Sequence, residues 1–120
     1  MNQLLPPKFL RILFALPFLV FGAFHLMSAE QMQGAVPPYV PGGMIWIYVT
    51  GAFLILAAIA LIINKFAKAA GYLLGIMLLV FIITIHLPGA MKGDQMAVTG
   101  LLKDFALMIA AMFIGNFSAK

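Results

Sequence analysis

The sequence contains no cysteine and little charge: 8% of its 120 residues are charged, and only three of these are acidic. Without cysteine, disulfide frameworks, iron–sulfur ligation and cysteine nucleophiles are excluded. Any redox chemistry would need a bound cofactor or a partner protein. Soluble domains carry about 25% charged residues, so this chain has too few polar groups to cover a globular surface. The composition predicts an integral membrane protein embedded in a lipid bilayer.

Apolar residues make up 65% of the chain and gather in four runs. A helix needs about 20 residues to cross a bilayer. We therefore expect one all-α domain over residues 1–120, an integral membrane four-helix bundle with spans at about residues 9–27, 43–63, 69–87 and 97–117. The proline-rich residues 36–43 cannot form a helix and are expected to lie as an outer cap. The first run could alternatively be a signal peptide, although no small-x-small cleavage site precedes Glu30.

The fourth span must contain two charged residues, Lys103 and Asp104. If it began after Asp104, the helix would reach only about 20 Å by Phe117, against a hydrocarbon core of about 30 Å. The helix is therefore expected to start near Ala97, which places both charges about two turns inside the membrane.

Basic residues predict the orientation of the bundle. With four crossings, one side of the membrane holds five of the seven basic residues, and the opposite loops hold only Lys92; the five are Lys8, Arg11, Lys65, Lys68 and Lys120. Cytoplasmic loops carry an excess of lysine and arginine, so both the N-terminus and the C-terminus are expected to be cytoplasmic. In this interpretation Arg11 is a snorkelling anchor of the first span.

The remaining ionisable side chains converge at one depth beneath the cap. His25 and His86 lie near the outer ends of the first and third spans, and Lys103 and Asp104 lie in the outer half of the fourth. A charge at the centre of a span costs about 2.5–3.5 kcal/mol, so such groups usually face the bundle interior and are paired. We predict that these four residues form a ligand-binding or polar cluster. The alternative is that each is an ordinary structural or interfacial residue.

Two aromatic residues are expected to cap this pocket: Tyr39 in the proline-rich segment and Trp46 at the start of the second span. Asp104 is too short to reach water and needs a partner on another helix, with the histidines as first candidates and Thr84 and Thr99 as lesser ones. A quinone headgroup is a ligand that such a protonatable cluster would suit.

Other ligands are less well supported by the sequence. Two histidines at one depth would permit bis-histidine haem ligation, but no basic set for the haem propionates is evident beyond Lys92 and Lys103. No metal site is predicted, because the four available ligands lack a diagnostic spacing; they are His25, His86, Asp104 and Glu30. So few exposed basic residues give no case for nucleic-acid binding.

Small residues recur at helical spacing in two spans. Gly71 and Gly75 form one stripe, and Ala111 and Gly115 form another. Such stripes allow close contact between membrane helices. With loops this short, packing within the bundle is the favoured interpretation, and a homodimer is the alternative.

Four motifs in order resemble the DoxX family of small four-helix bacterial membrane proteins over nearly the whole chain. They are Arg11 with residues 21–25 (FGAFH), residues 46–51 (WIYVTG), His86, and residues 102–107 (LKDFAL). The resemblance implies a multi-pass protein of the bacterial inner (cytoplasmic) membrane. Many DoxX relatives carry a glutamate on the second span where this chain has Leu54, which puts the chemistry of that carboxylate in doubt.

DoxX relatives differ in function, so the resemblance implies fold more strongly than reaction. The chain has no complete catalytic motif. We expect an accessory or ligand-binding component of a membrane redox system, with a redox partner protein. A quinone-linked oxidoreductase subunit and a membrane-protein assembly factor are the alternatives. A transporter is disfavoured, because four helices leave little room for alternating access.

Overall fold

The computed structural model describes residues 4–120, which form helices joined by short turns. The described part of the chain is 81% helical and contains no strand, which confirms the all-α prediction. Four helical stretches are long and apolar enough to cross a membrane. They are α1 (Pro7–Met27), α3 (Met44–Ile63), the continuous stretch Ala67–Met91, and α6 (Gln95–Asn116).

The third stretch has three parts: α4 (Ala67–Phe81), the π-helix η2 (Ile82–His86) and α5 (Leu87–Met91). Between α1 and α3 lie α2 (Ala29–Met32) and the short 3₁₀ helix η1 (Gln33–Ala35), followed by turns. The third span is longer than the sequence predicts, because the helix continues through Pro88 instead of ending at residue 87.

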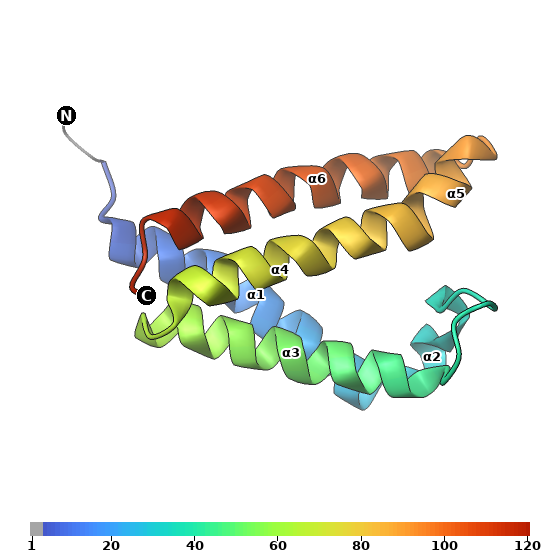
Figure 1. Ribbon diagram of the computed structural model, residues 1–120, viewed down its shortest axis with the longest axis horizontal. Coiled ribbons are helices and arrows are strands. Elements are labelled where there is room, and N and C mark those ends of the chain that lie inside the picture. Colours follow the sequence, from blue (N-terminus) through green and yellow to red (C-terminus); the bar gives the residue numbers. More distant parts are fainter. Residues whose placement is uncertain (1–3) are drawn as a thin grey trace.

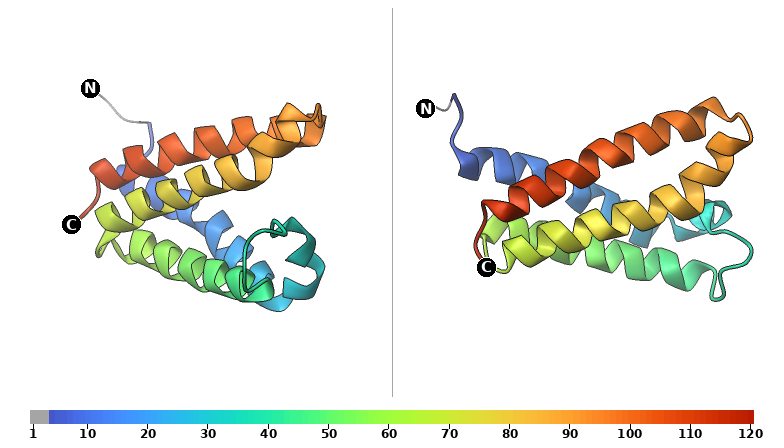
Figure 2. Two further views of the ribbon diagram at one scale, coloured as in Figure 1. Left: turned by 45° about the vertical axis from the view of Figure 1, so that its right-hand side comes forward. Right: turned by 45° about the horizontal axis from the view of Figure 1, so that its top comes forward.

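The helices form two antiparallel pairs, α1 with α3 and α4 with α6 (Figure 1). The pairs meet where α3 turns into α4, and they diverge towards the other end of the molecule (Figures 1 and 2). We call the first end the hairpin end, since it carries the α3–α4 turn and both described ends of the chain. The second is the cap end, since it carries α2 and α5.

The core lies where the two pairs meet. Leu61 of α3 and Leu74 of α4 are fully buried there. Ala15 and Phe18 of α1 and Ala111 of α6 belong to the same cluster. The first span therefore contributes to the core of the bundle.

Glycines bring α4 and α6 into direct contact. A Cβ added at Gly71 would lie 2.6 Å from the backbone oxygen of Ala111, and one added at Gly75 would lie 2.8 Å from the side chain of Met112. Gly115 faces the backbone of Lys68 and Gly71. These small residues therefore serve packing within the bundle.

The start of α6 lies two residues before the expected one. Asp94 caps the helix, and its Oδ1 accepts a hydrogen bond from the Met96 backbone N–H at 3.0 Å. A cap aspartate satisfies one of the unpaired N–H groups of the first turn. Asp104 consequently lies about 14 Å along the helix, near its middle.

Candidate ligand-binding site

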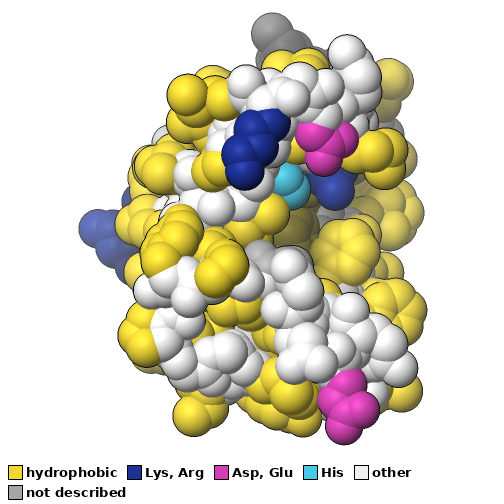
Figure 3. Space-filling view, turned by 90° about the vertical axis from the view of Figure 1, so that its right-hand side faces the viewer, with side chains coloured by type: hydrophobic (Ala, Val, Ile, Leu, Met, Phe, Trp, Pro, Cys, Tyr) yellow, Lys and Arg dark blue, Asp and Glu magenta, His cyan; other side chains and the backbone are white. Residues whose placement is uncertain are grey.

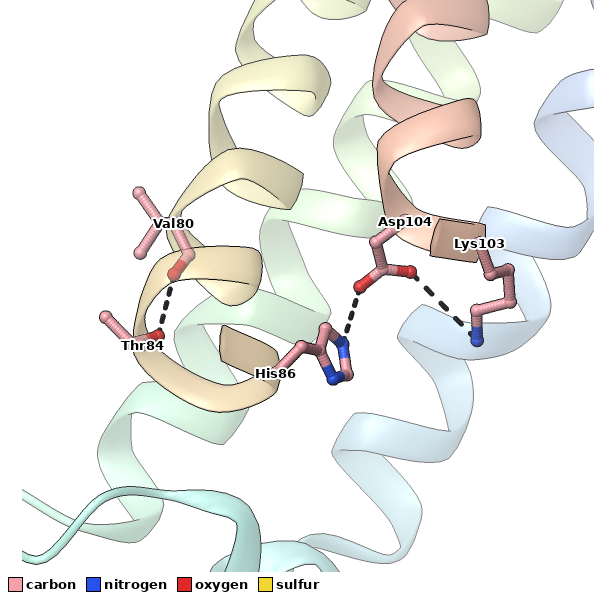
Figure 4. A network of polar contacts seen from close by, with 5 residues as sticks. All are labelled: Val80, Thr84, His86, Lys103 and Asp104. Carbon is pink, nitrogen blue, oxygen red and sulfur yellow. Dashed lines mark hydrogen bonds and ion pairs between the residues drawn. The ribbon is translucent and has the colours of Figure 1, made fainter. Parts of the chain in front are cut away.

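The third span widens into a π-helix just before Pro88. Proline has no N–H, and its ring clashes with the carbonyl four residues earlier, here that of Thr84. The regular series of α-helical backbone hydrogen bonds therefore cannot continue through Pro88. Thr84 uses its hydroxyl to donate a hydrogen bond to the Val80 oxygen at 2.7 Å (Figure 4). His86 is the last residue of this π-turn. Such π-turns are frequent at functional sites.

His86 reaches across to α6 and pairs with Asp104. The distance from His86 Nε2 to Asp104 Oδ2 is 2.8 Å, and Lys103 Nζ lies 4.0 Å from the other carboxylate oxygen (Figure 4). The carboxylate is buried, whereas the lysine side chain is 64% exposed. With Asp104 ionised, its carboxylate accepts a hydrogen bond from the Nε2–H group of His86. The partner that the sequence required for Asp104 is thus a histidine on a neighbouring helix.

Gly100 makes room for the His86 ring. A Cβ at this position would lie 2.8 Å from His86 Cε1 and 2.9 Å from Nδ1. We expect Gly100→Ala to displace the imidazole and break its hydrogen bond to Asp104. The lost buried hydrogen bond costs about 1–3 kcal/mol, partly offset by about 1 kcal/mol of helix propensity.

Imidazole ¹⁵N NMR of the purified protein measures this effect. In Gly100→Ala, the His86 Nε2 resonance should lose the shift that hydrogen bonding to Asp104 produces. Gly34→Ala is the matched control, because nothing lies within 4 Å of a Cβ there. An unchanged His86 resonance in Gly100→Ala would contradict the packing role of Gly100.

The structure places His25 apart from this pair. Its Nδ1 lies 2.6 Å from the Phe21 oxygen of its own helix, and its Cβ packs against Gly51. A carbonyl oxygen only accepts, so Nδ1 holds the ring proton and Nε2 of the neutral ring is left as an acceptor. The expected group of four therefore divides into His86, Asp104 and Lys103 on one side and His25 on the other.

An apolar cavity of about 590 Å³ lies near the cap end, between α3 with the cap and α4 with η2. Its lining includes Trp46, Phe53 and Phe81, with His25, Thr50 and Thr84 as its principal polar contributors. We call it the cap-side cavity. Figure 3 looks onto this end, where hydrophobic side chains surround a hollow between the two helix pairs. The lining contains His25, but not His86, Lys103 or Asp104.

The cap forms part of the cavity wall, and Trp46 joins the cap to α3. The Trp46 indole donates a hydrogen bond to the Pro41 oxygen, and both Pro37 and Trp46 line the cavity. Gly42 and Gly43 have positive φ angles of 99° and 50°, a backbone that favours glycine. Tyr39 is 70% exposed and is not among the residues that line this cavity, so its role as a cap residue stays a prediction.

The structure also bears on the metal site, the haem site and the span-two carboxylate that were considered from the sequence. In the described residues, no three histidine, aspartate or glutamate side chains gather as a metal-binding group. His25 lines the cap-side cavity, whereas His86 pairs with Asp104 outside that lining, so the two histidines do not face one shared cavity that could hold a haem. Leu54, at the position where DoxX relatives carry glutamate, is buried in the apolar core.

Sequence reasoning missed the role of Arg11. Its side chain does not extend freely from the helix: Arg11 is only 9% exposed, and its Nε donates a hydrogen bond to the Leu61 oxygen at 2.7 Å. Leu61 lies in the last turn of α3, where carbonyl groups have no helical partner. Sequence reasoning also missed Gly51 and Gly100. A glycine inside a helix lowers helix stability by about 1 kcal/mol relative to alanine. Glycine within a predicted span is therefore the signal that could have indicated a close contact at both positions.

The fold is that of a helical membrane protein, with four helices fit to span a bilayer and an apolar cavity between its two helix pairs. A family model described as a domain of unknown function, DUF8561, matches residues 14–100. This is well over half of the sequence, and the chain belongs to this family. The matched stretch includes both histidines and the whole lining of the cap-side cavity, and it ends before Lys103. No curated protein and no solved structure matches the chain.

Proposed function

We propose that the protein binds an isoprenoid quinone, or its quinol, as an accessory component of a membrane redox system. The observation that carries this proposal is the cap-side cavity, an apolar space of about 590 Å³ with a histidine in its wall. Small-molecule pockets typically measure about 300–1,000 Å³ and combine apolar walls with a few polar groups. The ring of an isoprenoid quinone would enter the cavity from the bilayer, in which the isoprenoid tail is dissolved.

The polar atoms of the cavity wall favour a ligand with hydroxyl groups. When its ring is neutral, His25 offers Nε2 as an acceptor, because its Nδ1–H group donates a hydrogen bond to the Phe21 oxygen. Thr84 likewise offers the lone pairs of its hydroxyl oxygen, because its hydroxyl proton is donated to the Val80 backbone oxygen. A quinol donates two hydroxyl protons from a flat ring, and the aromatic side chains of Trp46 and Phe81 supply apolar surface for that ring.

The binding role is better supported than a catalytic one. An oxidoreductase subunit would need a group that exchanges protons with the bound ring. The cavity lining holds a single histidine that could do so, His25, and the hydrogen-bonded pair of His86 and Asp104 lies outside it. An assembly factor would need no apolar cavity at all.

The proposal extends to the setting of the protein. We place both termini on the cytoplasmic side of a bacterial inner membrane and relate the chain to DoxX-like proteins. The support is the excess of basic residues at the hairpin end and the order of the motifs along the chain.

The only tryptophan in the sequence, Trp46, lies in the cavity wall and gives a direct test. Quinones quench tryptophan fluorescence at short range, so titration of the detergent-purified protein with a decyl-benzoquinone should give saturable quenching. Val80→Phe enlarges a side chain of the cavity wall and should weaken binding about tenfold. Leu79→Phe is the matched control, since Leu79 is 40% exposed and does not line the cavity.

Quenching that rises linearly without saturation would show only partition of the probe into the detergent micelle. Equal saturable quenching in Val80→Phe and Leu79→Phe would place the binding site elsewhere. Either result would contradict the proposal.

Removal of the histidine should separate quinol from quinone. We expect His25→Leu to weaken binding of the reduced probe by about tenfold, the effect of one lost hydrogen bond, and to change binding of the oxidised probe much less. Quenching of Trp46 by the oxidised probe gives the affinity for quinone. Displacement of the oxidised probe by the reduced one, followed as recovery of Trp46 fluorescence, gives the affinity for quinol. Equal affinities for the reduced probe in His25→Leu and the parent protein would remove His25 from the site.

A further inference from the structure

Arg11 is a buried cation without a carboxylate partner in the part of the chain that the structure describes. The one hydrogen bond that it makes there runs from Nε to the Leu61 oxygen at 2.7 Å. A guanidinium group has five N–H donors, so its two terminal amino groups remain available. A buried charge without a partner is costly, and a counter-ion supplied from outside the protein would offset that cost.

The same arginine lines an open groove of about 650 Å³ at the hairpin end. One wall is the start of α1 with the residues before it, including Leu5 and Leu10. The other wall is the end of α6, including Phe113 and Phe117. We call this space the Arg11 groove. Apart from Arg11, its lining contains one polar residue, Ser118.

Charge is distributed unevenly between the two ends of the bundle. The hairpin end holds five basic side chains, whereas all three acidic side chains of the sequence lie near the middle or the cap end; they are Glu30, Asp94 and Asp104. A molecule that occupies the Arg11 groove therefore meets positive charge and apolar walls together.

We propose that the Arg11 groove binds one anionic glycerophospholipid. The headgroup phosphate accepts hydrogen bonds from the terminal guanidinium nitrogens of Arg11, a pairing that is geometrically favourable and often bidentate. An acyl chain lies against Leu10, Phe113 and Phe117. The groove lies at the opposite end of the bundle from the cap-side cavity, so this inference is independent of quinone binding.

Native mass spectrometry of delipidated protein tests the proposal. Phosphatidylglycerol and phosphatidylcholine with identical acyl chains are added in equal amounts, and retained lipids are counted. The parent protein should retain one phosphatidylglycerol in preference to phosphatidylcholine. Ser118→Glu places a negative charge in the groove without removing the Arg11–Leu61 hydrogen bond, and it should lower phosphatidylglycerol retention by about tenfold.

Gln33→Glu is the matched control, because it adds the same charge at an exposed site near the cap end. It should retain the lipid as the parent protein does. If Arg11→Gln folds, it should lose the preference for phosphatidylglycerol as well. Equal retention of the two lipids by the parent protein, equal phosphatidylglycerol retention by Ser118→Glu and Gln33→Glu, or displacement of the lipid by inorganic phosphate would overturn the proposal.

Discussion

Gly71→Val should lower the stability of the bundle by about 3 kcal/mol, the upper end of the range for overpacking a close contact. The reason is backbone geometry. A Cβ at Gly71 would lie 2.6 Å from the Ala111 carbonyl oxygen and 2.9 Å from Gly115 Cα, and neither atom can move unless α6 moves with it. Close approach of small residues supplies much of the attraction between membrane helices, so separation of α4 and α6 also removes contacts along their length.

Denaturation of the purified protein in mixed micelles, followed by far-UV circular dichroism, measures this loss. Leu79→Val is the control, because it introduces the same side chain on the same helix at an exposed position. It should unfold within about 0.5 kcal/mol of the parent protein. Equal stability of Gly71→Val and Leu79→Val would show that α4 and α6 are not in close contact.

The second large effect concerns the pair formed by His86 and Asp104. Each single replacement by leucine leaves the other group in the bundle without its hydrogen-bond partner, at a cost of about 1–3 kcal/mol. The double replacement leaves no orphaned group and should recover part of the loss, as happens when both partners of a buried pair become apolar. The two effects should therefore be non-additive, with a coupling energy of about 1 kcal/mol or more.

A double-mutant cycle of unfolding free energies measures the coupling. Asp104→Asn supplies a further comparison, because its amide oxygen can still accept the His86 Nε2 proton. It should lose less stability than Asp104→Leu. Strict additivity of the His86→Leu and Asp104→Leu effects would mean that the two side chains do not interact in the folded protein.

The membrane fold was predictable because it depends on length and composition. Four apolar runs and a bilayer thickness are enough to position four helices, and the start of α6 follows from the need to span about 30 Å. The pairing of Asp104 with a histidine was also within reach, since a short carboxylate inside a membrane requires a partner. These inferences use only distance along the chain and the cost of burying charge.

Depth alone could not divide the histidines between two environments. His25 and His86 lie on different helices, but the first turns back to Phe21 of its own helix, while the π-turn before Pro88 accompanies the approach of the second to α6. Which face of a helix a residue occupies depends on local backbone geometry and on neighbouring helices. The burial of Arg11 has a similar origin, because it depends on how the end of α3, with the Leu61 oxygen, packs against α1.

The quantity of quinone that accompanies the purified protein tests the central claim most directly. Mass spectrometry of organic extracts, after gentle purification from quinone-containing membranes, should find about one quinone per protein chain in the parent protein and in Leu79→Phe, for a single pocket of this size. Val80→Phe should retain little of it. Absence of quinone from the parent protein, or equal amounts in Val80→Phe and Leu79→Phe, would contradict the assignment of the cap-side cavity as a quinone site.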